Sequence, residues 1–370
     1  MHKIISRHVT KHAKPVQHAQ TFAPWRAWVS LSGISPARLG WLAASLALVA
    51  TSACTWAAKP NLKPEVDAFV AEMADKHGFD QASLKGILGQ ARHQQSIIDA
   101  MNRPAEAKPW RDYRKIFLTE DRARGGERFW SKNEAILKQA EERYGVPPEI
   151  ITAIIGVETR YGANTGRHRV LDSLVTLAFD YPKRGKFFRG ELEQFLLLTR
   201  EEHLDPLLIE GSYAGAMGQG QFIASSYRSY AVDFDSDGHR DLWRSQADAV
   251  GSVANYFNRH GWQAGQAVAE RLEHPKGPYT ELVAAGMKPS LTAAQLLASG
   301  IEPPQGLGTD GLASLILLDG ADGDEYWLGL NNFYVITRYN HSNLYAMAVY
   351  QLGQWIRQLH EAQQSAAAGS

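Results

Sequence analysis

Apolar residues recur at helical spacing through most of the chain from Pro64 to about Arg143. Residues three or four positions apart lie on the same face of a helix, so this spacing predicts helices with one buried side. The first stripe of this kind consists of Val66, Phe69, Val70 and Met73. The pattern therefore predicts a helical N-terminal region over residues 59–145.

A helix with an unusual polar position is predicted within residues 147–162. Its two leading prolines suit a helix start, where a missing N–H costs nothing, and Gly162 suits a C-terminal stop. The residues between them are apolar at helical spacing. Glu158 comes four residues after Ile154 and three after Ile155, so its carboxyl is expected on their apolar face.

Helices are predicted to alternate with glycine-rich loops over residues 146–265, which we expect to form one core region. One clear helix spans residues 187–200, where Phe188, Leu192, Phe195 and Leu196 share a face. Residues 266–330 differ, because prolines interrupt the pattern. Two short apolar runs there predict the strands of a small hairpin, at residues 313–318 and 326–330.

The last segment, residues 331–370, is expected to add a helix over residues 340–358 and to end in a loose tail over residues 365–370. Near its start, tyrosines lie beside asparagines, and these include Tyr339, Asn340 and Tyr345. Aromatic faces next to amides suit a sugar-binding surface. A capped helix with core aromatics is the alternative.

Residues 1–58 have the pattern of a targeting segment. They contain six Lys or Arg residues and no Asp or Glu. The apolar run at residues 42–50 is too short to span a bilayer but fits the apolar core of a signal peptide. An uncleaved anchor or a disordered tail is the alternative.

Cys54 follows three small residues, as at a bacterial lipoprotein cleavage site, although Thr51 stands where leucine is usual. Lipidation of Cys54 would anchor the protein to the outer membrane, facing the periplasm. Ordinary cleavage near residue 57 or 58 would instead remove the cysteine. Cys54 is the only cysteine of the chain, which excludes an internal disulfide and a cysteine-rich zinc site.

The length of 370 residues suffices for two domains or for one large domain with subdomains. The net charge is zero over the full chain, but the residues after position 58 comprise 33 basic and 39 acidic side chains. A mildly acidic body argues against nucleic acid as the main partner.

Glu158 is the first candidate for chemistry. A carboxyl on an apolar face is costly to ionise, so burial should raise its pKa and keep it protonated near neutral pH. A protonated carboxyl can act as a general acid. The alternative is a glutamate at a helix end that pairs with Arg160 or with a backbone amide.

A second candidate is the segment of residues 213–222, which is dense in small residues and contains Gln219 and Gln221. Glycines let a ligand approach the backbone closely. Glutamines offer a donor and an acceptor together, which suits sugar hydroxyl and acetamido groups. A tight helix crossing without a ligand is the alternative.

A third candidate resembles the start of an EF-hand calcium loop. Asp233, Asp235 and Asp237 occupy positions 1, 3 and 5, a glycine follows at position 6, and His239 would offer its backbone carbonyl. The usual glutamate at position 12 is replaced by an arginine, but Asp248 could close a longer loop. The alternative is a solvated acidic turn.

The chain resembles the bacterial lytic murein transglycosylases of the B type. The residues that carry this resemblance include segments 155–162, 211–218, 237–239 and 338–342, and their order is kept over about residues 60–360. Two departures are the Ile-Ala pair at 223–224, where Met-Pro is common, and Asp248, which is one residue further from Asp237 than expected.

The resemblance implies a mainly α fold, a lysozyme-like α-helical superhelix with a small β hairpin and an EF-hand-like loop. It also implies cleavage of the β-1,4 bond between N-acetylmuramic acid and N-acetylglucosamine in peptidoglycan, with 1,6-anhydromuramic ends as products. Glu158 matches the single catalytic acid, and a structural Ca²⁺ and a monomer are expected. The matching substrate-binding positions are Tyr113, Ser212, Gln221, Tyr256, Tyr339, Asn340 and Tyr345.

Two other functions stay open on the sequence. A hydrolytic muramidase would use the same Glu158 with water as the acceptor. A noncatalytic peptidoglycan-binding protein would use the same surface as a lectin. The products of digestion would separate these functions, because they are anhydro ends, reducing ends or uncleaved glycan.

Overall fold

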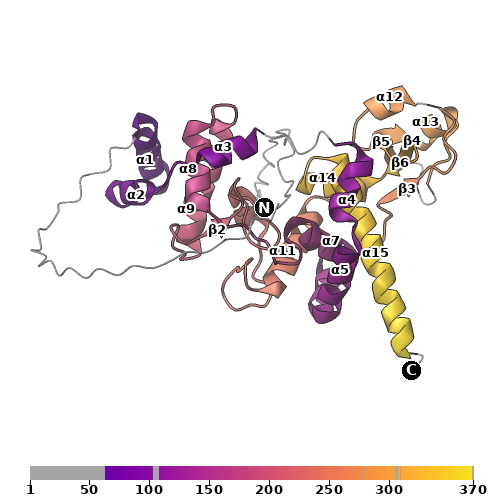
Figure 1. Ribbon diagram of the computed structural model, residues 1–370, viewed down its shortest axis with the longest axis horizontal. Helices are drawn as coiled ribbons and strands as arrows, with labels where there is room; N and C mark the ends of the chain where they lie inside the picture. The colour runs from indigo at the N-terminus through magenta and orange to yellow at the C-terminus, as the bar shows by residue number, and fades with distance from the viewer. Residues whose placement is uncertain (1–62, 103–107, 278, 305–306, 309, 369–370) are drawn as a thin grey trace, which may run out of the picture.

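The computed structural model describes residues 63–102, 108–277, 279–304, 307–308 and 310–368. The predicted targeting segment and Cys54 lie outside these residues. Within them, the fold is mainly helical with small sheets, which confirms the predicted class. Helices α1 and α2 lie at one end of the molecule and the larger sheet lies toward the other (Figure 1).

The N-terminal region is helical, as its apolar stripes predict. Its first predicted stripe is buried on α1, and the helices begin at side-chain caps where the sequence supplies them, such as Asp80 at α2 and Thr119 at α5. The six helices are α1 (Pro64–His77), α2 (Gln81–Leu88), α3 (Gln95–Met101), α4 (Trp110–Phe117), α5 (Glu120–Lys132) and α6 (Glu134–Tyr144).

Helix α7 (Pro148–Thr159) is buried along its whole length, whereas the sequence pattern predicts one apolar face. Pro148 stands at its start as expected. The predicted stop at Gly162 is wrong, because Arg160 already adopts a left-handed conformation with φ of 52° and caps the helix.

The helices after α7 confirm the predicted alternation with loops. The predicted helix at residues 187–200 is α9, and it packs against α8 and α10. The bounds of this group are α8 (Val170–Asp180), α9 (Gly185–Glu201), α10 (Ala224–Tyr230) and α11 (Gln246–Arg259). A two-stranded sheet joins this region, with β1 (His168–Arg169) antiparallel to β2 (Glu210–Gly211).

The predicted hairpin is β5 (Leu312–Asp319) with β6 (Asp324–Gly329), paired from Ser314 with Gly329 to Asp319 with Asp324. It belongs to a four-stranded antiparallel sheet in the order β3-β6-β5-β4. A small separate core lies on this sheet. The remaining elements here are β3 (Ala269–Arg271), β4 (Leu291–Thr292), α12 (Thr280–Ala284) and α13 (Ala293–Ala298).

The C-terminal segment forms two helices in place of the one predicted, α14 (Asn331–Tyr339) and α15 (Asn343–Ala368). The predicted loose tail is therefore wrong as far as Ala368, which still belongs to α15. Helix α15 packs against α7, α5 and α4, and its last turns project beyond the body (Figure 1). In the described part of the chain, no helix combines the length and hydropathy that a membrane crossing requires.

Candidate active site

Glu158 lies in the last turn of α7, and its exposed fraction is 9%. The Tyr345 hydroxyl, from the first turn of α15, donates a hydrogen bond of 2.7 Å to Oε1 of Glu158. The contact follows from the packing of α15 against α7. The Glu158 carboxyl is thus buried, and a hydroxyl from another helix fixes the direction of one of its oxygens.

Arg122 braces the helix that carries Glu158. It is buried on α5, and its guanidinium donates hydrogen bonds to the carbonyls of Gly156 and Ile116. The guanidinium also lies 5.3 Å from the centre of the Phe117 ring. Burial lowers the pKa of Arg122 to about 10, which still leaves it charged at neutral pH.

Tyr161 completes this brace from the loop after α7. Its φ of 62° is left-handed, and its hydroxyl donates a 2.6 Å hydrogen bond to the carbonyl of Arg122. A Cβ added at Gly156 would lie 2.6 Å from the Tyr161 ring, so this glycine is needed for the ring to fit. A Cβ added at Gly126 would meet the Ile356 side chain first, at 2.4 Å, and the Tyr161 hydroxyl at 2.7 Å. Burial raises the pKa of Tyr161.

A chain of hydrogen bonds joins the end of α7 to two distant loops. The Thr159 hydroxyl donates to the carbonyl of Gln219 at 2.8 Å, and the backbone N–H of Gln219 donates to the carbonyl of Leu242 at 2.8 Å. The Gln219 side chain also donates to the carbonyl of Trp243 at 3.3 Å. Thr159, the residue next to Glu158, is thus linked directly to the loop of Gln219 and through Gln219 to the loop of Leu242 and Trp243.

Three of the predicted substrate positions lie together around this segment. Tyr256 and Tyr339 meet edge to face with ring centres 4.8 Å apart, and the Tyr339 hydroxyl donates to the Gly220 carbonyl at 2.5 Å. Gln221 has a left-handed φ of 52°, and its amide donates to the Thr165 carbonyl at 3.0 Å. The hydrogen bonds of Gln221 and Tyr339 end on carbonyls of the protein itself. This arrangement also fits the alternative for residues 213–222, which is a tight crossing of helices without a ligand.

The other predicted substrate positions are buried as well. Ser212 accepts a 3.0 Å hydrogen bond from the backbone N–H of Ala216, so its hydroxyl shapes the glycine-rich turn. Tyr113 lies on α4 with ring contacts to its neighbours on the same helix. Among the described residues, the buried Nδ2 of Asn340 has no hydrogen-bond acceptor. An unpaired buried donor is costly, so this atom is a candidate to meet a ligand.

Two other carboxylates that could have assisted Glu158 have structural partners. Asp172 pairs with Arg169 and accepts from the backbone N–H of Arg92 at 2.9 Å. Asp180 pairs with Lys63 and with His93. Both aspartates are thus engaged in ion pairs with other parts of the chain.

Neither Arg122 nor Thr159 was identified from the sequence as a residue that holds the site together. Arg122 stands in a helix with several other charged residues, where a solvent-facing side chain is the usual interpretation. The pair of glycines at 125–126 was the available signal. Glycine lowers the stability of a helix interior, so two adjacent glycines there indicate that another group packs closely against the helix. Thr159 stands next to Glu158 but carries no motif of its own.

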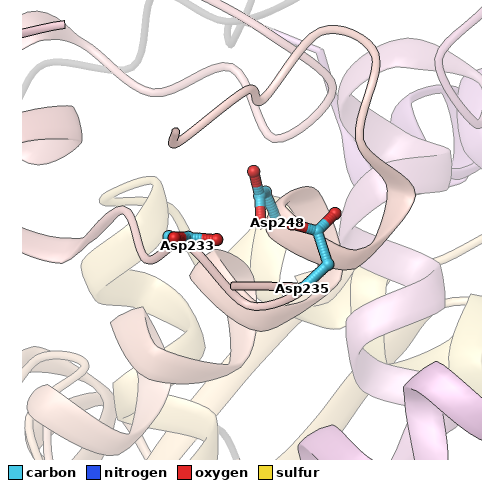
Figure 2. Close-up of side chains that lie close together, drawn as sticks. All are labelled: Asp233, Asp235 and Asp248. Atoms are coloured by element: carbon cyan, nitrogen blue, oxygen red, sulfur yellow. The ribbon is translucent and has the colours of Figure 1, made fainter. Parts of the chain in front are cut away.

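The predicted metal loop brings three carboxylates together. Asp233, Asp235 and Asp248 each offer an oxygen, and these atoms lie within 4.8 Å of one another (Figure 2). The oxygen-only donor set fits a hard cation such as Ca²⁺. Asp237 is not in this group, and its carboxylate accepts from the backbone N–H of His239 at 2.9 Å. Asp237 and His239 stay predicted ligands.

Asp248 also organises the loop without a cation. It is fully buried, and its two oxygens accept from the backbone N–H groups of Phe234 and Asp241 at 2.7 and 2.8 Å. Burial raises the pKa of Asp248, and the nearby carboxylates of Asp235 and Asp233 act in the same direction. Crowded like charges of this kind favour a cation.

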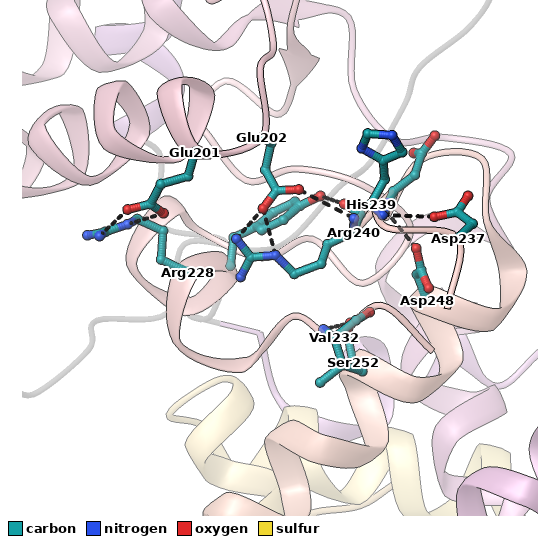
Figure 3. Close-up of polar contacts among 11 residues, drawn as sticks. Glu201, Glu202, Arg228, Val232, Asp237, His239, Arg240, Asp248 and Ser252 are labelled. Carbon is teal, nitrogen blue, oxygen red and sulfur yellow. Dashed lines mark hydrogen bonds and ion pairs between the residues drawn. The ribbon is translucent and has the colours of Figure 1, made fainter. Parts of the chain in front are cut away.

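Two ion pairs attach the loop region to α9. Arg240 pairs with Glu202, with Nε to Oε1 at 2.7 Å, and Arg228 of α10 forms a two-pronged pair with Glu201 at 2.9 and 2.6 Å (Figure 3). The pair of Arg240 with Glu202 therefore attaches the loop to the end of α9, and Asp248 holds the loop from within. The pair of Arg228 with Glu201 joins α10 to the same end of α9.

The mainly helical fold thus carries Glu158 buried in the last turn of a helix that is itself buried. The transglycosylase SLT domain matches residues 61–354. Over 301 residues the chain is 50% identical to the membrane-bound lytic murein transglycosylase B of Escherichia coli K12, covering 79% of this chain and 82% of that protein.

Two solved structures are also similar. The soluble lytic transglycosylase SltB1 of Pseudomonas aeruginosa has a TM-score of 0.77 and 49% identity, covering 80% of this chain and all of that one. The Escherichia coli lytic transglycosylase Slt35 in complex with calcium has a TM-score of 0.72 and 48% identity, covering 80% of this chain and 94% of that one. The chain belongs to the transglycosylase SLT domain family, and it is a lytic transglycosylase.

Proposed function

We propose that the enzyme cleaves the β-1,4 bond between N-acetylmuramic acid and N-acetylglucosamine in peptidoglycan and leaves 1,6-anhydromuramic ends. The observation that carries this proposal is the buried Glu158 with the Tyr345 hydroxyl at 2.7 Å. The murein transglycosylase name of the relative from Escherichia coli supports the substrate.

Glu158 acts first as an acid and then as a base. Its protonated carboxyl donates to the glycosidic oxygen, and the C–O bond to the anomeric carbon breaks. The acetamido group of the substrate stabilises the positive charge that develops there, a role that a second carboxylate takes in ordinary glycosidases. The ionised Glu158 then removes the proton of the muramic 6-hydroxyl, whose oxygen bonds to the anomeric carbon.

The structural partners of Asp172 and Asp180 support this one-carboxylate chemistry over a two-carboxylate mechanism. The Tyr345 hydroxyl donates to Glu158, so it stabilises the ionised carboxylate in the second half of the reaction. Reprotonation of Glu158 by the attacking hydroxyl returns the enzyme to its starting state.

Mass spectrometry of digested peptidoglycan tests the proposal. We expect muropeptides with 1,6-anhydro ends, which weigh one water less than hydrolysis products because the 6-hydroxyl replaces water as the acceptor. Reducing ends would identify a hydrolytic muramidase. Undigested glycan from folded enzyme would identify a noncatalytic peptidoglycan-binding protein.

We also infer a structural calcium ion held by Asp233, Asp235 and Asp248, with Asp237 and the carbonyl of His239 as the remaining candidates. The relative Slt35 in complex with calcium supports the identity of the metal. The ion supplies positive charge among crowded carboxylates. It lies outside the steps assigned to Glu158, which belongs to a different segment.

We propose a periplasmic location for the enzyme, with the membrane-bound name of the relative in support. Cys54 is the proposed attachment point for a lipid. We expect Cys54→Ala to move the protein from the membrane fraction to the soluble periplasmic fraction of a Gram-negative host. A wild type that already fractionates as soluble would instead favour cleavage after Cys54.

A further inference from the structure

A hollow of about 450 Å³ lies between the end of α9, the strand β2 and the loop that leads to α11. We call it the Trp243 hollow, and the residues that matter here are Trp243, Arg244, Glu210, Leu204, Leu208 and Thr165. It is separate from Glu158, which does not line it. The mechanism above uses none of these six residues.

Trp243 is a fixed platform in this hollow. Its indole Nε1 donates to the Glu210 carbonyl at 3.1 Å, and its own carbonyl accepts from the Gln219 side chain at 3.3 Å. The indole also packs against the buried ring of Tyr227, with centres 5.7 Å apart. An aromatic side chain that is already ordered loses little entropy when a ligand packs on it.

The charges around the platform are of both signs. The guanidinium of Arg240 is occupied by Glu202 (Figure 3), but neither Arg244 nor Glu210 forms an ion pair within the described part of the chain. Both side chains are exposed. Leu208, at the same hollow, is 74% exposed, which is unusual for a large apolar side chain. The hollow thus offers an apolar surface beside one cation, Arg244, and beside the exposed carboxylate of Glu210, while the carboxylates of Asp237 and Asp241 accept backbone hydrogen bonds within the calcium loop.

The hollow adjoins two predicted substrate positions. Glu210 precedes Gly211 at the end of β2, and Ser212 follows directly. On the other side, the carbonyl of Thr165 accepts from the side chain of Gln221 at 3.0 Å. The walls of the hollow are thus continuous with the segments that carry both positions.

We propose that the Trp243 hollow binds the short peptide that the muramic residue carries in peptidoglycan. This inference rests on the proposed function. Such a peptide combines carboxylates, an ammonium group and small apolar side chains. Arg244 matches a carboxylate, Glu210 matches the ammonium group, and Trp243 with Leu208 matches the methyl groups. An uncharged sugar would leave both charges without a partner.

The test compares two substrates of equal glycan length, one with peptides on its muramic residues and one without. We expect Arg244→Met, which removes the charge without adding a carboxylate to the calcium loop, to lower kcat/KM roughly tenfold on the peptide-bearing glycan while cleavage of the bare glycan keeps its rate. Leu208→Asp, at a side chain that is largely exposed and so not needed for folding, should act in the same direction. Arg271→Met, the same loss of charge on β3, is the matched control and should alter neither substrate.

Equal losses on both substrates, or no loss on the peptide-bearing one, would overturn the proposal. Failure of the wild type to cleave either substrate would instead contradict the proposed function. Titration of the wild type with the free peptide provides a readout that does not depend on catalysis. The indole N–H resonance of Trp243, assigned by its absence in Trp243→Phe, should shift, and an unchanged resonance at saturating peptide would also overturn the proposal.

Discussion

Glu158→Gln is expected to keep the fold and to abolish cleavage of peptidoglycan. The amide has the shape of the carboxyl, and its oxygen can still accept the hydrogen bond from Tyr345. It cannot donate a proton to the glycosidic oxygen or remove one from the 6-hydroxyl. Turnover on purified peptidoglycan within about tenfold of the wild type, a barrier change of only about 1.4 kcal/mol, would contradict the assignment.

Glu149→Gln is the matched control, because Glu149 is a buried glutamate in the first turn of the same helix. Burial raises the pKa of Glu149 too, and its carboxylate lies 3.5 Å from the guanidinium of Arg357. The same substitution there should leave the glycan products and their rate unchanged. Loss of activity in both variants with intact melting curves would show that the assay does not isolate Glu158.

Removal of calcium is expected to lower the melting temperature, while enzyme that is still folded remains active. A ligand that binds only the native state stabilises it by about 2.7 kcal/mol when its concentration is a hundredfold above the dissociation constant. Without the cation, the carboxylates of Asp233, Asp235 and Asp248 repel one another. Melting curves after chelation and after return of millimolar calcium provide the measurement.

The variants for this test differ in what else they disturb. Asp233 and Asp248 accept backbone hydrogen bonds within the loop, so replacing them damages the loop itself. Asp235 accepts from the hydroxyl of Ser245 at 2.7 Å, which makes Asp235→Asn the cleaner probe. This variant, like Asp237→Ala, should remove the calcium-dependent gain, and Asp322→Asn in the β5–β6 turn should keep it. A wild-type curve that calcium does not alter would identify a solvated acidic turn.

The sequence predicted those elements whose signal is local. The stripe on α1 and the helix α9 repeat their apolar residues at the helical period, and the β5–β6 hairpin consists of two short apolar runs with glycines between them. The apolar face of a predicted helix singled out Glu158, the resemblance to a known family matched it to the catalytic acid, and the structure adds the hydroxyl of Tyr345 beside it. These two residues are far apart in the chain, so no local pattern could have paired them.

The errors have physical reasons as well. A loose tail was predicted from residue 365 on, but alanine has the highest helix propensity and α15 continues to Ala368. Arg160 ends α7 in a left-handed conformation that glycine usually adopts, and such a choice depends on tertiary packing. The brace by Arg122 joins residues on two different helices, α5 and α7, which periodicity within either helix does not reveal.

The fit of Tyr161 against Gly156 constrains how this enzyme can change over generations. A lineage that replaces Gly156 by alanine first places a methyl group against the tyrosine ring, and α7 loses the support of the brace. A smaller residue at position 161 must come before such a change. The two positions are therefore expected to vary together and in that order among descendants, and a mutant library should randomise them as one unit.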